Sequence, residues 1–277
     1  MTGIRTWRRW ALGLATLCGA GRGYFVPHRY AGVSSAPATY AALEPLFRRA
    51  EPEFAARLVE ASLYLPALRG FVNTSPPAPR FEQDWFPRLD AAIAYTLVRT
   101  RRPGRIVEIG SGHSTRFMAR AIADEGLATV LTAIDPAPRA TLAGLPVEWL
   151  RQPLQTVGVA PFAALAAGDV LFIDSSHVLM PGSDVDILLN EICPRLPAGV
   201  LVHIHDIVLP DAYPEAWRWR GYNEQNALAG MLRGGTRLLW SSHWVVTRQA
   251  GEVTRVGLDA LPLAPGAHET SLWLETG

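Results

Sequence analysis

Apolar residues are spaced in two different ways along the chain, and the change falls near residue 100. Before it they recur at helical intervals over 38–50, 52–65 and 87–99, with a proline-rich break at 75–79. After it, short apolar runs alternate with helix-like segments, and the runs cover 105–109, 129–134, 147–150, 170–173 and 200–204. The first part therefore predicts helices, and the second predicts alternating strands and helices.

The apolar runs do not alternate with polar residues, which is typical of strands buried on both faces. Strands that alternate with helices form a parallel sheet. Two later runs, 236–240 and 271–274, are expected at the edge of that sheet, where an antiparallel direction is allowed. We therefore predict a Rossmann-like, doubly wound α/β fold with seven mostly parallel strands in 101–277, preceded by a helical extension or cap in 1–100.

The first strand leads into a sharp turn that contains two glycines. Residues 106–115 read Ile-Val-Glu-Ile-Gly-Ser-Gly-His-Ser-Thr, and a helix-like segment, 116–123, follows. Gly110 and Gly112 permit a positive φ and carry no Cβ atom, so the backbone can approach a ligand closely. Such a turn occurs in dinucleotide-binding folds and in S-adenosylmethionine (SAM) sites.

The residues around the turn distinguish between these two cofactors. A dinucleotide fingerprint requires a third glycine three residues after the second, and this chain has Thr115 there. Glu108 precedes the turn and could instead hold the cationic amino group of a ligand. Asp135 ends the second strand, about 20 residues beyond the glycines, where an acid reaches ribose hydroxyls. These motifs favour SAM over NAD, although an acid before Pro136 also suits a simple turn.

Ionisable side chains gather at the ends of the later strands. Asp174 and His177 follow the fourth strand, and the fifth contains His203, His205 and then Asp206. Ligands of doubly wound sheets bind beyond the carboxyl ends of the strands, so these residues are candidates for a site. His203 and His205 share one strand face. We interpret the deeper His203 as a core residue. For His205, a structural role and a functional role both remain open.

His177 lies three residues after Asp174, which places a group that titrates near neutral pH beside a carboxylate. Methylation of a hydroxyl group requires a base, or a metal ion that acidifies the hydroxyl. Asp174, His205 and Asp206 could together bind Mg²⁺, Mn²⁺ or Zn²⁺ through oxygen and nitrogen atoms. Acids at strand ends also form purely structural ion pairs, so this metal centre is one of two alternatives.

Composition narrows the classes of protein that the chain could belong to. Hydrophobic residues make up 49% of its 277 residues, enough to bury a large core. The formal net charge is +1 and the sequence contains no long run of basic residues, so we expect no nucleic-acid partner. Cys18 and Cys193 fit neither a metal spacing nor a disulfide framework, which makes a reducing cytoplasm the default.

The N-terminus carries a basic and apolar pattern. Arg5, Arg8 and Arg9 precede an apolar stretch from Trp10 to Ala20, which is too short to span a bilayer, so we expect no stable membrane insertion. The stretch also matches the apolar part of a signal peptide, with a small-x-small sequence at 19–21. We favour a retained amphipathic or buried helix in a cytoplasmic protein, because SAM is a cytoplasmic cofactor.

Together these motifs resemble the class I SAM-dependent methyltransferases, in particular the bacterial group known as methyltransferase family 24. The resemblance covers about Pro79 to Leu274. Its motifs are Glu108–Gly112 (motif I), Ala133–Asp135 (motif II), Asp174–His177 (the Asp-x-x-His of motif IV), Pro197–Asp206 around strand five, and Tyr213–Trp217 with Tyr222–Gln225 after it.

The resemblance implies SAM as the cofactor, bound by Glu108, Gly110, Ser111, Gly112, Ser114, Asp135 and Asp174. Related metal-dependent O-methyltransferases have an Asp after strand four, an acidic pair after strand five, and a Lys or His base three residues past the first Asp. By position this implies His177 as the base, and Asp174, His205 and Asp206 as ligands of Mg²⁺ or another divalent metal. Those relatives have Asp-Asn or Glu-Asp in place of His205-Asp206, so the metal and its identity stay open.

The resemblance also implies an acceptor pocket and an assembly. Trp85, Tyr213, Trp217 and Tyr222 are the candidate acceptor-binding residues, and ordinary helix packing is the alternative for these rings. In similar proteins the N-terminal extension covers the active site or builds a homodimer.

We therefore expect a SAM-dependent methyltransferase that acts on a small-molecule acceptor, at a hydroxyl oxygen, with His177 as general base and divalent-metal assistance as an option. Two alternatives remain. One is a metal-dependent enzyme that uses the SAM scaffold for another reaction, and the other is a non-catalytic interaction module that retains the fold.

Overall fold

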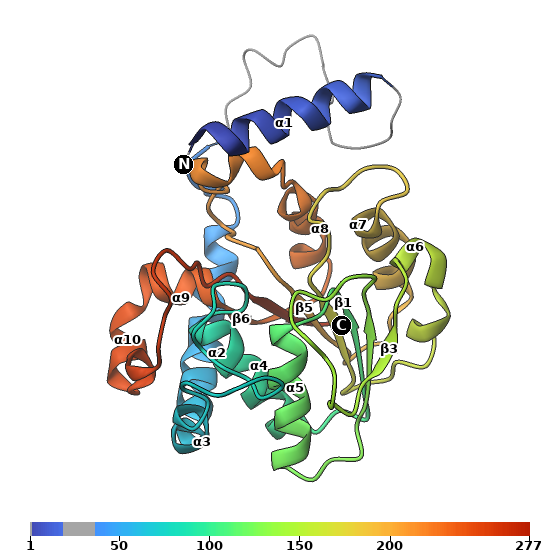
Figure 1. Cartoon of the computed structure of the whole chain (residues 1–277). Helices are drawn as coiled ribbons and strands as arrows, with labels where there is room; N and C mark the ends of the chain where they lie inside the picture. Colours follow the sequence, from blue (N-terminus) through green and yellow to red (C-terminus); the bar gives the residue numbers. More distant parts are fainter. Residues whose placement is uncertain (1, 19–36) are drawn as a thin grey trace.

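A seven-stranded sheet forms the centre of the computed structural model, which describes residues 2–18 and 37–277 (Figure 1). The strands are β1 (Arg105–Ile109), β2 (Val130–Ile134), β3 (Glu148–Leu150), β4 (Val170–Ile173), β5 (Leu201–Ile204), β6 (Arg237–Ser241) and β7 (Leu272–Glu275). Their order across the sheet is β3-β2-β1-β4-β5-β7-β6. β1 to β5 pair in parallel, and β7 runs antiparallel between β5 and β6. The predicted Rossmann-like, mostly parallel sheet is confirmed.

The strand order reverses at β1, and this reversal positions the site. β1 pairs with β2 on one side and with β4 on the other. The connections after these two neighbouring strands lead to opposite sides, which leaves a crevice beyond the carboxyl ends of β1 and β4. Gly110 and Asp174 immediately follow these two strands, and Asp135 follows β2.

Helices surround the sheet. They are α1 (Thr2–Leu17), α2 (Glu44–Leu63), α3 (Leu65–Arg69), α4 (Arg88–Arg101), α5 (His113–Asp124), α6 (Leu154–Val157), α7 (Asp184–Ile187), α8 (Leu228–Arg233), α9 (Ser242–Arg248) and α10 (Ala250–Arg255). Short 3-10 or π turns are η2 (Ala160–Phe162), η3 (Leu188–Ile192), η4 (Cys193–Arg195), η5 (Glu215–Arg220), η6 (Glu224–Ala227) and η7 (Leu258–Ala260). Within the described residues, none of these helices has the length and apolar content that crossing a membrane requires.

The two helices predicted over 38–50 and 52–65 are a single helix, α2, that starts later than expected. Thr39 instead forms an isolated antiparallel bridge with Asp211. The helix then continues through Pro52, which removes only one backbone hydrogen bond. Phe47 and Phe54 on either side of the proline are fully buried, and this burial holds the two halves in one helix.

The segment before α4 shares its apolar core with the sheet. Phe81 lies 5.2 Å from Phe117 of α5, and Phe86 lies 5.7 Å from Phe172 of β4, between ring centroids. These contacts join residues on the two sides of the domain boundary predicted at residue 100. The division into two domains at that boundary stays a prediction. The extension is therefore in direct contact with the part of the sheet that carries the site.

Two buried acids join the start of α4 to the strand β7. Glu269 forms a paired contact with Arg88, at 2.8 and 3.0 Å, and accepts a hydrogen bond from the amide of Leu89. Asp90 accepts the backbone amides of Thr270 and Ser271 at 3.0 and 2.9 Å. Because the first amides of a helix have no partner within it, Glu269 also serves as the cap of α4.

We expect Glu269→Ala to lower the free energy of unfolding by about 3 kcal/mol, because it leaves the half-buried Arg88 and the amide of Leu89 without their buried partner. The matched control is Glu275→Ala, which breaks a more exposed pair with Arg237 and should cost less than about 1 kcal/mol. Urea unfolding followed by circular dichroism measures both. Equal losses would mean that Glu269 contributes no more than a surface ion pair.

Candidate active site

A cleft of about 390 Å³ opens beyond the carboxyl ends of β1, β2 and β4. Its wall is built from the residues that follow these strands and β3. They are Ile109, Gly110, Ser111, Ile134, Asp135, Pro136, Ala137, Arg139, Pro153, Leu154, Gln155, Asp174, Ser175, His177 and Asp184. Asp135, Asp174 and His177 all line this cleft, so it joins three of the residues predicted from the strand ends.

The glycine turn brings the backbone of β1 against the end of β4. Gly110 has a φ of +73°, and a Cβ atom placed there would come within 2.0 Å of the carbonyl oxygen of Asp174. Asp135 closes the turn from the other side, because its carboxylate accepts the amide of Ser111 at 2.7 Å and that of Ala137 at 2.7 Å. Each carboxylate oxygen can accept a second hydrogen bond, so Asp135 can still receive a hydroxyl group from the cleft.

Glu108 lies beneath the turn and does not line the cleft. Its side chain is fully buried and accepts the hydroxyl groups of Ser114 at 2.5 Å and Thr115 at 2.6 Å. Burial raises its pKa from 4.5 to about 8, against the effect of these two hydrogen bonds, and the charges of Asp174 and Asp135 add to the increase. The carboxyl therefore ties β1 to the start of α5, and its predicted contact with the cofactor stays a prediction.

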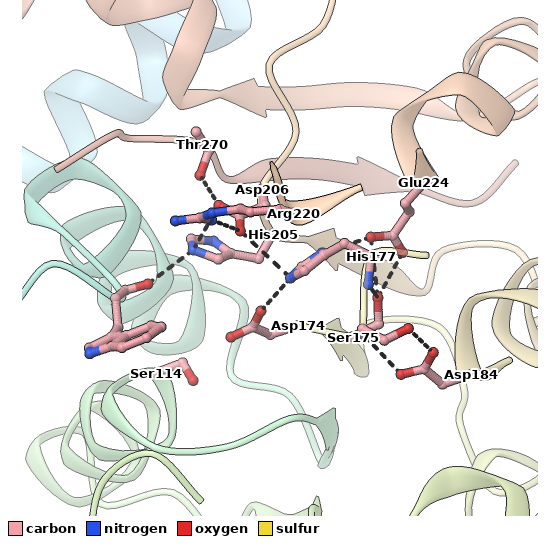
Figure 2. A network of polar contacts seen from close by, with 12 residues as sticks. Ser114, Asp174, Ser175, His177, Asp184, His205, Asp206, Arg220, Glu224 and Thr270 are labelled. Atoms are coloured by element: carbon pink, nitrogen blue, oxygen red, sulfur yellow. Dashed lines mark hydrogen bonds and ion pairs between the residues drawn. The ribbon is translucent and has the colours of Figure 1, made fainter. Parts of the chain in front are cut away.

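His177 is held at both ring nitrogens by carboxylates (Figure 2). Nδ1 lies 2.9 Å from Glu224, and Nε2 lies 3.2 Å from Asp174 and 3.6 Å from Asp206. Ser175 supports this arrangement, since its hydroxyl donates to Glu224 and accepts the backbone amide of His177. The ring orientation is thus determined from both sides, with Nε2 directed toward the side of the cleft.

The backbone at two of these residues is strained. His177 has a φ of +60° and Asp206 a φ of +54°, in the left-handed region that residues with a Cβ atom seldom adopt. Both follow strands that border the site. Such conformations persist where surrounding contacts impose them, and they gather at functional sites.

The carboxylates control the charge of His177. Burial alone would lower its pKa, but the hydrogen bonds with Asp174 and Glu224 and the nearby charge of Asp206 raise it well above 6.5. Burial would likewise raise the pKa of Asp174, yet the hydrogen bond with His177 and the charge of His205 lower it to about 2. The pair is therefore an ion pair at neutral pH in this structure.

The structure does not show the predicted metal centre at Asp174, His205 and Asp206. Nε2 of His205 lies 3.0 Å from the backbone carbonyl of Trp85 and must donate a hydrogen to it. Because Nε2 carries this hydrogen, it is not available to a metal ion although it lies 3.8 Å from Asp206, whereas Nδ1 of the same ring is buried with no hydrogen-bond partner. Among the residues the structure describes, no group of three His, Cys, Asp or Glu side chains is arranged around a metal position.

The other strand-five histidine is a core residue, as predicted. His203 is fully buried, its Nε2 lies 2.8 Å from the hydroxyl of Ser271, and its ring stacks 3.7 Å from Phe172. Burial lowers its pKa well below 6.5, so the ring is neutral.

Three of the four aromatic residues proposed for the acceptor form one cluster beside His177. The ring of Tyr222 lies 4.5 Å from the imidazole, and the rings of Tyr213 and Trp217 lie 6.0 and 6.1 Å from Tyr222. Trp85 stands apart from them, half exposed, with the guanidinium of the cleft residue Arg139 4.0 Å above its ring. Acceptor binding by these residues stays a prediction.

Two charged residues of the site were not singled out from the sequence. Glu224 is fully buried on Nδ1 of His177, 47 positions away in the chain, and Arg220 donates to Asp206 at 3.3 Å. Glu224 lies in the motif Tyr222–Gln225 noted for its resemblance, but no local spacing connects it with His177. Only the path of the chain after β5 brings these partners together.

A sheet with this strand order, a glycine turn after β1 and an acid after β2 matches the Rossmann-like fold of methyltransferases. Residues 107–207, from within β1 to just past β5, match the family model Methyltransf_24, described as a methyltransferase domain. This part of the chain is therefore similar to a methyltransferase domain, in agreement with the resemblance that the motifs predicted.

Solved structures are similar to the chain at low identity. The SAH-bound methyltransferase PaMTH1 of Podospora anserina is 17% identical, with 88% of this chain and 99% of that one covered and a TM-score of 0.37. The plantazolicin methyltransferase BpumL, in complex with a pentazolic desmethylPZN analog and SAH, is 14% identical, with 86% and 99% covered and a TM-score of 0.42. No curated protein sequence matches the chain significantly.

We expect Gly110→Ala to destabilise the fold by at least about 2 kcal/mol more than Gly168→Ala. Both glycines have a positive φ, +73° and +88°, but a Cβ atom at 110 would collide with the backbone of Asp174, whereas nothing lies within 4 Å at 168. Denaturant unfolding gives the loss of stability in each variant. Because both variants carry the cost of a positive φ, the difference between the two losses measures the collision. Similar losses would contradict the close approach of β1 to β4.

Glu108 should make stability depend on pH. Its pKa is raised in the folded state, so between about pH 4.5 and 8 the folded chain binds more protons than the unfolded chain, and stability falls as the pH rises. Glu108→Gln removes this decline, by an amount on the order of 5 kcal/mol across the window. Unfolding measured at several pH values tests this, with the exposed Glu215→Gln as the control that should follow the wild type.

Proposed function

We propose that the chain transfers the methyl group of SAM to a hydroxyl oxygen of a small molecule, with His177 receiving the hydroxyl proton. The observation that carries this proposal is the position of His177 in the wall of the cleft that Asp135 also lines, with its ring clamped by Glu224 and Asp174. A titratable group held this firmly beside a cleft suits a general base.

In this proposal SAM lies along the cleft. Its ribose hydroxyls would donate to Asp135, and Pro136, Pro153 and Leu154 would offer apolar surface to the adenine ring. The methionine part would extend past Gly110, where the missing Cβ atom lets the backbone come close. The sulfonium methyl group would then face the side of the cleft that holds Asp174 and His177.

The proposed step is a direct displacement. A lone pair of the acceptor oxygen forms a bond to the methyl carbon, the carbon–sulfur bond breaks, and its electron pair stays on sulfur to give neutral SAH. The hydroxyl proton passes to Nε2 of His177. Because SAM already carries its leaving group, the protein's main tasks are alignment of oxygen and methyl group and exclusion of water.

His177 must be neutral to accept that proton, and the bound cofactor favours this state. SAM carries positive charge, and a cation beside Asp174 competes with the imidazolium for the same carboxylate, which lowers the pKa of His177. Glu224 keeps the remaining proton on Nδ1 and directs Nε2 toward the acceptor. Glu224 is thus a positioning residue, and the transfer rate is expected to rise with pH.

The same proposal includes an acceptor pocket, a cellular location and an assembly state. The aromatic cluster of Tyr213, Trp217 and Tyr222 would form the wall of an acceptor pocket, since it lies beside the imidazole. A cytoplasmic location follows from the supply of SAM, and a homodimer stays a prediction.

The first test is calorimetric titration with SAH, with and without Mg²⁺. We expect one-to-one binding near micromolar Kd, about −8 kcal/mol, that Mg²⁺ leaves unchanged. Absence of binding would contradict SAM as the cofactor, and a Mg²⁺-dependent affinity would restore the metal centre.

The second test is His177→Gln, assayed by SAH release with an acceptor found in a screen of small hydroxyl compounds. We expect turnover to fall by about 10²–10³-fold while SAH affinity is retained, because only the base is lost. Glu224→Gln should lower kcat with little change in KM. The matched control is His243→Gln, which removes an imidazole paired with Asp211 at 2.7 Å outside the cleft. Full turnover of the His177 variant would remove the base assignment.

A further inference from the structure

The helix α1 presents a row of large apolar side chains to solvent. Trp7, Trp10, Leu14 and Leu17 are 73%, 69%, 58% and 68% exposed. Their spacing of three, four and three residues confines them to an arc of about 80° on the helix surface. Exposed apolar residues scattered singly need no explanation, but a contiguous row marks a surface that contacts something else.

The charge of the same helix indicates what that contact is. Thr2–Leu17 contains three arginines, Arg5, Arg8 and Arg9, and no acidic residue. Arg8 is exposed, and its position lies about 140° from the middle of the apolar row. A helix with a basic part, an apolar face and two tryptophans has the composition of helices that lie in the interface of an anionic membrane.

Length argues against a second copy of the chain as the occupant of this face. The four positions follow the a and d spacing of a coiled coil, but they cover less than two heptads. A stable coiled coil needs three or four heptads. Three like charges on each helix would also repel a copy, whereas they attract anionic lipid.

The position of α1 relates this surface to the site. α1 contacts η5 and lies beside it in Figure 1. Trp217 of η5 belongs to the aromatic cluster, through Tyr222, that borders His177. A lipid surface against α1 would therefore lie close to the acceptor side of the domain.

We propose that α1 docks the protein on an anionic lipid surface, with Trp7, Trp10, Leu14 and Leu17 inserted at the level of the headgroups and Arg8 attracted to the lipid phosphates. The contact is peripheral and reversible. It does not depend on the reaction proposed above, and it uses a surface outside the cleft.

Vesicle co-sedimentation of the full chain, with any tag at the C-terminus, tests the proposal. We expect binding to vesicles of phosphatidylcholine and phosphatidylglycerol, and at least tenfold weaker binding to phosphatidylcholine alone, in about 0.1 M salt. The variant Trp7→Ala/Trp10→Ala should bind the anionic vesicles at least about tenfold more weakly. Arg8→Glu should lose about fivefold or more, and salt near 1 M should weaken binding of the wild type.

Control variants show whether the loss of vesicle binding is specific to α1 or follows from any change to an exposed apolar or charged side chain. Leu63→Ala/Val159→Ala removes exposed apolar side chains elsewhere, and Arg255→Glu reverses an exposed charge on α10, so both should bind as the wild type does. Circular dichroism confirms that each variant is folded. Equal binding by the tryptophan variant and the wild type, or no vesicle binding at all, overturns the proposal. A third result also overturns it. The wild type would form a dimer in sedimentation equilibrium and bind no vesicles, and the tryptophan variant would be a monomer.

Discussion

The backbone of Gly110 lies against the end of β4 so closely that no side chain fits between them. The amide of Asp174 donates to the carbonyl of Ile109 at 2.8 Å, and the amide of Gly110 donates to Ile134 at 3.1 Å. These two hydrogen bonds align the ends of β1, β2 and β4 on one edge of the sheet. Because the strand order reverses at this place, the aligned ends open into the cleft rather than into a continuous surface.

The ionisable side chains at this edge of the sheet lie so close together that they determine one another's charge. Three carboxylates, of Asp174, Asp206 and Glu224, surround one imidazole, and Arg220 neutralises part of their charge. Charges this close in a poorly hydrated place interact strongly, so the protonation of His177 depends on what else occupies the cleft. A cationic cofactor would change that balance directly, which links its binding to the state of the proposed base.

The N-terminal helices take part in the site rather than merely preceding it. The carbonyl of Trp85 binds His205, the ring of Phe86 lies 5.5 Å from the same imidazole, and Asp90 holds the segment before β7. Phe86 also packs against Phe172 in β4. The positions of the strand-five side chains therefore depend on residues from well before the first strand.

The amino-acid sequence alone predicted the strands, the glycine turn, the acid within β1 and the acids that follow β2 and β4. These features are local: an unbroken apolar run predicts a strand buried on both faces, and Gly110 is required where a strand turns against its neighbour. Only the tertiary structure decided the partners of each side chain. It placed Glu224 on His177 and turned Nε2 of His205 to the carbonyl of Trp85. It also kept α2 continuous through Pro52. Such pairings join residues far apart in the chain. They form because a buried polar group needs a hydrogen-bond partner, and the fold as a whole determines which group lies next to it.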